Sequence, residues 1–261
     1  MAVTRDAVAP LGRMLLAQTG SELRTRWRIP AFSLTIVALP VLFYTFFGLP
    51  LARQTTPGGV SLGAYLLASF AAYSVGSVMV FGFGIGVATE RGLKVDVLMR
   101  ATPLPPIVAI LAKVLNALAY ALLSLVVLIV YGVVVGGVRE DLTVWLVMIA
   151  RLLAGSLPFI ALGFAIGYLS GPNVAPALAN LVYLPLAFAA GMFMPLSQLP
   201  GFVRRIAPYL PTYHLGQLGW SALGANTEPL AVSLAWLAGY TVLFLLIALR
   251  AYRREESRKF G

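Results

Sequence analysis

Cysteine is absent from the 261 residues, and histidine occurs once, as His214. Without cysteine the chain can form neither disulfide bonds nor thiolate metal sites. A lone histidine also excludes bis-histidine haem ligation and disfavours a metal site built from this chain alone. Charged residues make up only 11% of the chain, against about a quarter in soluble domains. The sequence therefore predicts no metal site, and its content of charged residues is too low for a typical soluble domain.

Apolar sequence takes the place of these residues. Hydrophobic residues make up 60% of the chain, and its mean hydropathy is +0.90. The apolar runs are unbroken, which favours membrane-spanning helices over the alternating strands of a barrel. The first run begins only at Ile29, behind several arginines, and no small-residue cleavage site follows it closely. We therefore expect a retained first span and an all-α integral membrane protein, with residues 1–261 forming one transmembrane domain.

Six apolar runs are long enough to cross a hydrocarbon core of about 30 Å. The predicted spans are residues 29–52, 60–87, 106–135, 143–170, 177–194 and 229–249. The charge-free stretch from Leu152 to Val203 is too long for one span, and "SGPNVAP" (170–176) divides it. The fourth span begins at 143 or at Leu152. A start at 143 would place Arg151 within the span, and a start at Leu152 would place it at the outer interface. For Arg151 we prefer the interface position.

Basic residues orient the six spans. Of the 19 basic residues, 13 lie before the first span, between the second and third spans, or in the tail, and Lys113 near the start of the third span is the fourteenth on this side. The positive-inside rule therefore places both termini in the cytoplasm, and we expect the protein in the cell membrane of a bacterium. We attribute the net charge of +10 to membrane topology and to contact with anionic lipids, and not to nucleic-acid binding. Lys113, two turns into the third span, is expected to reach the cytoplasmic headgroups.

The N-terminal stretch 8–28 has helical spacing before the first span. Leu11, Leu15 and Leu16 share one face, and the arginines fall elsewhere. This pattern predicts an elbow helix that lies in the cytoplasmic interface, with Arg24 and Arg26 at anionic lipid and Trp27 at headgroup level. A simple basic topology anchor is the alternative.

The charged segment "TERGLKVDVLMRATPLPP" (89–106) interrupts the apolar runs. Glu90 precedes Lys94 by four residues, as Asp96 precedes Arg100, and both pairs have the order that stabilises helices. The Thr102-Pro103 step ends the pattern. The segment predicts an amphipathic cytoplasmic helix over 90–102. Its apolar stripe requires either the membrane interface or another protein as a partner.

A proline-rich stretch, residues 195–212, precedes the last span. Four prolines preclude a continuous span there, yet apolar residues recur at helical spacing. We expect a short outer helical segment, re-entrant or interfacial, because broken backbone at membrane depth must be covered by protein or water. It is either an outer gate or an interfacial cap, and His214 beside it is expected outside the core with a local hydrogen bond. The gate residues would be Phe193, Pro195, Leu199, Pro200, Pro211 and Tyr213.

Aromatic and polar residues within the spans are candidates for a substrate path. The candidates are Phe70, Tyr73, Asn116, Tyr183 and Phe188. Intramembrane polar residues are often functional, but Asn116 can equally hold helices together. The aromatic residues are as easily explained by ordinary packing.

Two motifs carry a family resemblance. "TERGLKVDVLMRATPLPP" resembles the loop after the second span in permeases of type-2 ATP-binding-cassette (ABC) exporters, although Gly92 falls earlier than the family's glycine. "GMFMPLSQLPGFVRRIAPYLPTYHLGQL" (191–218) is similar to the family's connection between the fifth and sixth spans. The six-span plan with an elbow helix also fits, so the resemblance covers essentially the whole chain.

The resemblance implies a coupling helix seated in a cleft of a cytoplasmic ATPase. The coupling residues would be Glu90, Arg91, Leu93, Lys94, Val97, Leu98 and Arg100. This chain lacks a G-x-x-x-x-G-K-[ST] phosphate loop, so ATP and magnesium would be bound by a separate subunit, and no cofactor is expected on this chain. The family further implies two ATPase copies and a second permease copy, identical or related.

The implied function is that of a permease subunit, without enzyme activity of its own, in an exporter of hydrophobic or amphiphilic, drug- or antibiotic-like compounds. Export of lipid-linked glycans or lipids, or an ATP-independent channel or scramblase, remains open. An ion-coupled transporter is disfavoured because the nine acidic residues fall in loops, ends or tails. An intramembrane protease is disfavoured because no G-x-S-x-G occurs and His214 lies in a proline-rich connection.

Overall fold

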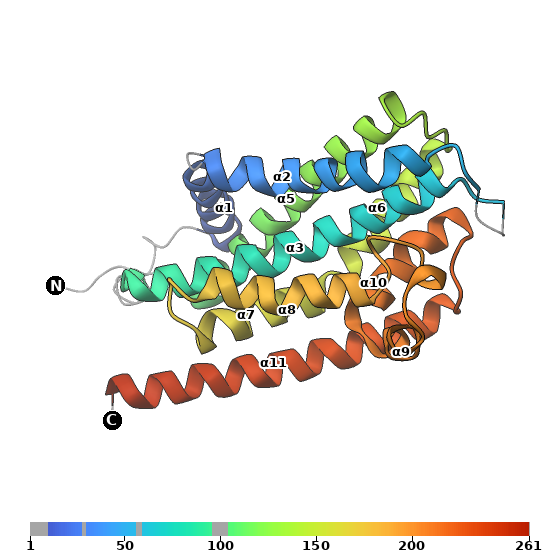
Figure 1. Ribbon diagram of the computed structural model, residues 1–261. Helices are drawn as coiled ribbons and strands as arrows, with labels where there is room; N and C mark the ends of the chain where they lie inside the picture. The colour runs from blue at the N-terminus through green and yellow to red at the C-terminus, as the bar shows by residue number, and fades with distance from the viewer. Residues whose placement is uncertain (1–9, 28–29, 56–58, 96–103, 261) are drawn as a thin grey trace.

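The computed structural model describes residues 10–27, 30–55, 59–95 and 104–260, and these ranges contain helices and no strand. The all-helical prediction is confirmed. Figure 1 shows the long helices packed side by side, with α1 and the C-terminal end of α11 at the same end of the bundle. The main helices are α1 (Leu11–Trp27), α2 (Pro30–Phe43), α3 (Leu62–Gly92), α5 (Pro106–Val134), α6 (Leu142–Ala154), α7 (Leu157–Leu169), α8 (Ala175–Ala189), α9 (Gly201–Ile206), α10 (Pro211–Trp220) and α11 (Leu230–Phe260).

Four helical stretches are long and apolar enough to cross a membrane. They are Leu62–Gly92, Pro106–Val134, Leu142–Leu169 and Leu230–Ser257. The third consists of α6 and α7 and agrees with the predicted span 143–170. The six-span plan remains a prediction, because α8 is short and the side chains of residues 30–36 in the first predicted span lie outside what the structure describes. The 15 residues of α8 rise only about 22 Å, less than a hydrocarbon core.

The first predicted span, 29–52, changes helix type along its length. After α2, residues Tyr44–Gly48 form a π-helical turn, and Leu49–Leu51 form a 3-10 turn. The Thr45 hydroxyl donates to the Val41 carbonyl (2.8 Å) and lies 2.8 Å from the Tyr131 hydroxyl of α5. π-Helical turns of this kind are often found at functional sites, and this one contributes aromatic residues to the cluster described below.

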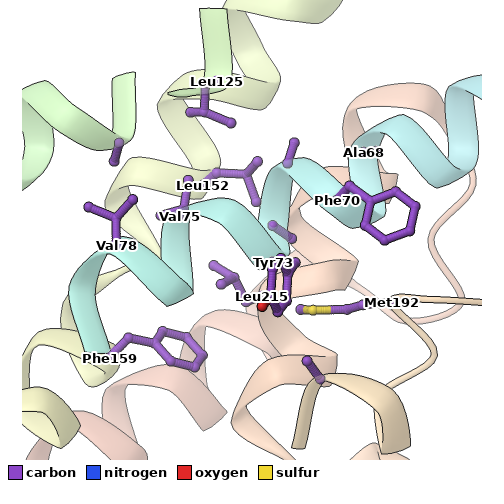
Figure 2. Packing of buried hydrophobic residues seen from close by; sticks show 14 of the residues in the cluster. Ala68, Phe70, Tyr73, Val75, Val78, Leu125, Leu152, Phe159, Met192 and Leu215 are labelled. Atoms are coloured by element: carbon purple, nitrogen blue, oxygen red, sulfur yellow. The ribbon is translucent and has the colours of Figure 1, made fainter. Parts of the chain in front are cut away.

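The central element of the bundle is α3. Its first turn is capped by Ser61, whose hydroxyl accepts from the Ala64 amide (3.3 Å). Within its most apolar 18-residue window, 94% of the residues are buried. Figure 2 shows the residues packed around it, which are Leu125 of α5, Leu152 of α6, Phe159 of α7 and Leu215 of α10. No face of α3 in this region is available to lipid.

Two glycines of α7 allow it to pack directly against the backbone of α3. A Cβ atom on Gly163 would lie 2.8 Å from the Met79 carbonyl oxygen, and one on Gly167 would lie 2.7 Å from Val87 Cβ. Their spacing is the G-x-x-x-G pattern of close helix pairs in membranes. Larger residues at these positions would force the two helices apart.

The region after α8 differs most from the prediction. The expected outer segment 195–212 contains short 3-10 turns and α9, but it is followed by α10, a helix that the sequence analysis missed. All ten residues of α10 are buried. His214, expected outside the core, is 0% exposed, so that prediction is wrong. Pro211 starts the new helix at the position that proline tolerates best, and the uncharged run after it can enter the bundle.

Replacing Gly163 with alanine tests the α3–α7 contact. The added methyl group meets backbone and has no flexible neighbour to displace. We expect Gly163→Ala to cost about 1–3 kcal/mol and to lower the melting temperature in detergent by several degrees. The matched control is Gly239→Ala on α11, where a Cβ atom meets nothing within 4 Å. Equal melting temperatures for the two variants would contradict this packing.

Candidate functional site

The last turn of α3 carries the first two predicted coupling residues. Glu90 and Arg91 belong to α3, which ends at Gly92. Lys94 follows with a φ of 55°, a conformation that interrupts a helix. The predicted helix 90–102 is therefore wrong at its start, and Glu90 and Lys94 are not paired along one helix. Val97, Leu98 and Arg100 lie outside the described residues, so the remainder of that helix is still a prediction.

Lys113 joins three helices at this end of the bundle. Its Nζ lies 3.0 Å from Glu22 Oε1 of α1 and also forms an ion pair with Glu90 of α3. Only 10% of the lysine side chain is exposed. The expectation that Lys113 reaches the headgroups is wrong, because α1 and α3 supply carboxylates within the protein. A buried charge of this kind is tolerated only when paired.

Arg91 joins α3 to two further helices. Its Nη1 donates to the Gly167 carbonyl and to the Ser170 carbonyl (3.2 Å), at the C-terminal end of α7. Its Nε lies 2.6 Å from Glu255 Oε2 of α11. A cation at the C-terminus of a helix is favourable for the helix dipole. Arg91 therefore holds the ends of α3, α7 and α11 together.

We call Glu22, Glu90, Arg91, Lys113 and Glu255 the inner charge cluster. Its ion pairs join α1, α3, α5 and α11, and the hydrogen bonds of Arg91 add α7, at the end of the bundle where α1 lies (Figure 1). Adjacent residues of α3 form both halves of the cluster, so a displacement of this turn acts on all five helices. The sequence analysis treated Glu90 and Arg91 as partner contacts, whereas the structure pairs them within the chain.

Of the predicted elbow residues, Arg24 is exposed on α1. The side chains of Arg26 and Trp27 lie outside what the structure describes. Leu11 and Leu16 of the same helix are 62% and 76% exposed. This exposure is compatible with an interfacial helix, but it does not test that role.

Most of the predicted substrate-path residues meet in one aromatic cluster. Phe193 is stacked on Phe188, with ring centroids 3.9 Å apart, and packs edge-on against Phe70 (5.5 Å) and Tyr73 (5.3 Å). Tyr73 in turn contacts Tyr183 (5.5 Å). Phe70, Tyr73, Tyr183 and Phe193 are buried, whereas Phe188 is 39% exposed. The cluster is thus open on one side.

Two further aromatic residues of this cluster were missed. Phe43 and Phe47, at and within the π-helical turn, both contact Phe193, at 5.0 and 6.0 Å between centroids. The sequence signal was their spacing of four residues after Pro40. Asn116, by contrast, does not join the aromatic cluster. It is completely buried on α5.

The other predicted gate residues lie along the chain that leads into α10. Pro195 and Pro200 precede the short helices that begin at Leu196 and Gly201. Leu199 is half-buried and Pro200 is exposed. Pro211 begins α10, and the Tyr213 hydroxyl lies 2.8 Å from Thr227 Oγ1.

The polar side chains of α10 are bonded in several directions. Thr212 donates to the Leu186 carbonyl of α8 (2.7 Å), and Trp220 Nε1 donates to Ser69 of α3 (2.8 Å). His214 Nδ1 lies 2.7 Å from Glu228 Oε1, and Gln217 Nε2 donates to Thr227 Oγ1 (2.7 Å). The local bond expected for His214 is therefore present. These bonds explain how a helix with polar residues can be buried.

Arg151 also lies deeper in the bundle than the outer-interface position expected from the sequence. Because α6 begins at Leu142, Arg151 is about 13 Å along its axis. It is half-buried, and its Nη1 donates to Ser221 Oγ (2.8 Å), just after α10. The placement of Arg151 at the outer interface is wrong, because the earlier start of the fourth span is the one observed.

Comparison with known proteins finds similarity to membrane transport proteins. The model of the family described as "ABC-2 family transporter protein" matches residues 54–250. A Bacillus subtilis (strain 168) protein named "Putative transport permease YvfS" is 28% identical over 244 residues. The matched region covers 94% of this chain and 99% of the relative. The matched residues include α3 and the entire aromatic cluster except Phe43 and Phe47.

Replacing Lys113 with methionine tests the inner charge cluster. The substitution leaves the carboxylates of Glu22 and Glu90 without their cation. Loss of a fully buried partner costs about 3–5 kcal/mol; we expect about 2 kcal/mol here, because Glu90 is partly exposed. Thermal unfolding in detergent measures the loss. The triple variant Lys113→Met, Glu22→Gln, Glu90→Gln should recover most of it, and absence of recovery would show that the charges are not what Lys113 stabilises.

Proposed function

Because the chain belongs to the ABC-2 family of transporter proteins, we propose that it is the permease subunit of an ATP-driven exporter. As a permease it is a multi-pass membrane component of an ABC transporter and not itself an ATPase. The phosphate-loop motif is absent from its sequence, so ATP and magnesium would be bound by a separate ATPase subunit. Two ATPase copies would serve two permease copies.

The observation that carries the proposal is the inner charge cluster. It lies at the last turn of α3, directly before the charged segment expected to contact an ATPase. Leu93, which follows this turn, is 69% exposed and so offers an apolar contact to a partner. Movement of the ATPase against this segment would act on Glu90 and Arg91. Through their ion pairs it would act on α1, α5 and α11, and through the hydrogen bonds of Arg91 on α7. With both termini in the cytoplasm, this is the end that an ATPase would reach.

The outer end would respond through α3 and α10. Trp220 of α10 is bonded to Ser69 of α3, and Thr212 is bonded to α8. A tilt of α3 would therefore displace α10 relative to its neighbours. In this proposal α10 and the preceding segment form the outer gate, which opens to release substrate on the side opposite the ATPase.

The aromatic cluster supports a hydrophobic or amphiphilic substrate. Its rings come from the first span, α3, α8 and the segment after α8, and Phe188 and Phe47 are partly exposed at its edge. Flat apolar surfaces of this kind bind ring systems by offset stacking and edge contacts. We propose that drug-like or antibiotic-like amphiphiles pass along this surface.

Co-purification with an ATPase subunit tests the function. The tagged permease and its ABC ATPase should form a complex that hydrolyses ATP in lipid. We expect Leu93→Glu to reduce ATPase capture at least tenfold, because it places a charge in an apolar contact. Leu142→Glu is the matched control, because that leucine is 72% exposed at the opposite end of the bundle. If the unmodified permease captures no ATPase, a channel or scramblase becomes the better account.

Substitution at the open side of the aromatic cluster tests the substrate path. Phe188→Ala removes the ring stacked on Phe193. It should change several-fold the transport of aromatic amphiphiles relative to one another, or the resistance of cells to them, with little loss of ATPase capture. Leu181→Ala, at a leucine that is 73% exposed on the same helix, α8, is the control and should leave the profile unchanged. An unchanged profile for both variants would remove the aromatic cluster from the path.

A further inference from the structure

The chain after α8 exposes an apolar face. We call residues 201–209, which comprise α9 and the 3-10 turn that follows it, the α9 segment. Its side chains of Phe202, Ile206 and Tyr209 are 68%, 50% and 61% exposed. Their spacings of four and three residues place them on one helical face. An exposed face built from large apolar side chains marks a contact surface.

The other two sides of the α9 segment differ from this face. Val203 is half-buried and Ala207 is buried, so their side contacts the rest of the bundle. Arg204 and Arg205 are exposed and, at about 100° of helical turn per residue, project on the third side, away from the buried side and the apolar face. A helical segment with an apolar side and a basic side has the pattern of one that lies at a membrane surface.

The charge in this part of the chain is positive. No acidic residue occurs from Leu142 to Thr227, and Glu228, which follows, is paired with His214 at 2.7 Å. Arginine binds phosphate well, because its planar N–H groups can bond two oxygen atoms at once. The two arginines of the α9 segment therefore favour an anionic partner that carries phosphate.

The neighbouring surface indicates that this partner is lipid. Tyr209 packs edge-on against Trp236 of α11, with ring centroids 6.0 Å apart, and the Tyr240 hydroxyl donates to the Tyr209 carbonyl. Only 11% of the most apolar window of α11 is buried, so this helix presents a lipid-facing surface, which Tyr209 joins to the apolar face of the α9 segment. The contact lies at the end of the bundle opposite α1 (Figure 1). Tyrosine and tryptophan are enriched where a membrane meets water.

We propose that the α9 segment is a binding site for anionic phospholipids of the outer leaflet. Phe202, Ile206 and Tyr209 lie among the acyl chains, and Arg204 and Arg205 bind the phosphate of the headgroups. The apolar area holds the segment at the interface, and the two positive charges select anionic over zwitterionic lipids.

Bound lipid also positions the outer gate. Pro211 starts α10 two residues after Tyr209, so an anchored α9 segment fixes the point from which α10 extends. The transport cycle then depends on anionic phospholipid in the outer leaflet. This dependence rests on the proposed function, whereas lipid binding itself does not.

Fluorescence quenching by brominated lipids tests the site. Because the chain has no cysteine, Ile206→Cys can carry a single fluorescent label on the apolar face. The permease is placed in vesicles of phosphatidylcholine and phosphatidylglycerol, in which one of the two lipids has brominated acyl chains. At equal lipid content, we expect brominated phosphatidylglycerol to quench about threefold more effectively. Arg204→Gln with Arg205→Gln should remove this preference, whereas Arg53→Gln with Arg139→Gln, at exposed arginines before α3 and α6, should keep it.

Two results of this experiment would overturn the proposal. Equal quenching by the two lipids, with both arginines present, would show that the arginines select no headgroup. Absence of quenching by either lipid would show that protein or water covers the apolar face. Because both arginines are exposed, the melting temperature of the glutamine variant should equal that of the unmodified permease, so a lost preference is not a loss of fold.

ATP hydrolysis by the permease–ATPase complex tests the effect on the gate. Hydrolysis should be about threefold faster in vesicles that contain phosphatidylglycerol than in phosphatidylcholine alone, and Arg204→Gln with Arg205→Gln should lose the difference. Equal hydrolysis by the unmodified complex in both vesicles would overturn the effect on the gate. If no ATPase binds, that effect fails together with the proposed function, and quenching in the free permease still decides the lipid site.

Discussion

Burial of α3 on all sides is the constraint on which the rest of the structure depends. In lipid, apolar side chains gain little by leaving one apolar environment for another, so helices associate through close packing and polar contacts. Both are present around α3. Gly163 and Gly167 allow α7 to meet its backbone, and Ser74 of α3 lies 2.7 Å from Ser124 of α5. The Tyr183 hydroxyl of α8 donates to the Tyr73 carbonyl (2.8 Å).

Because α3 is one unbroken helix, it connects the two ends of the bundle. Ser69, bonded to Trp220 of α10, and Glu90, paired with Lys113, are 21 residues apart in the sequence. That separation corresponds to about 30 Å along a helix, close to the thickness of the hydrocarbon core. The inner charge cluster and α10 are therefore linked by a single element. The aromatic cluster lies between them, on the part of α3 that carries Phe70 and Tyr73.

Features that depend on local composition could be predicted from the sequence. The all-helical class follows from unbroken apolar runs, and the end of the fourth span at 170 follows from "SGPNVAP" (170–176), which divides the charge-free stretch. Phe70, Tyr73, Tyr183 and Phe188 were candidates as aromatic residues within spans, and the structure brings them together. Their contacts with Phe43 and Phe47 could not be foreseen, because a π-helical turn changes the face on which residues project.

Features that depend on a distant partner could not be predicted. Lys113 was expected to reach lipid headgroups, since the sequence does not show that α1 brings Glu22 to it. His214 was expected outside the core because prolines surround it, yet Glu228 pairs with it after the chain returns. The coupling segment was assigned a helix from residue 90, but α3 continues to Gly92 because its last turn is held by Lys113 and Arg91. In each case a tertiary contact overrides the local pattern.

The central claim is that movement imposed at the inner charge cluster reaches α10 through α3. Labelling of Thr212→Cys by a membrane-impermeant thiol reagent tests it most directly, because Thr212 is completely buried at the start of α10. Applied from the outer side to the permease–ATPase complex in lipid, the reagent should react slowly without nucleotide and much faster during ATP hydrolysis. Equal labelling in both conditions, while ATP is being hydrolysed, would contradict the account.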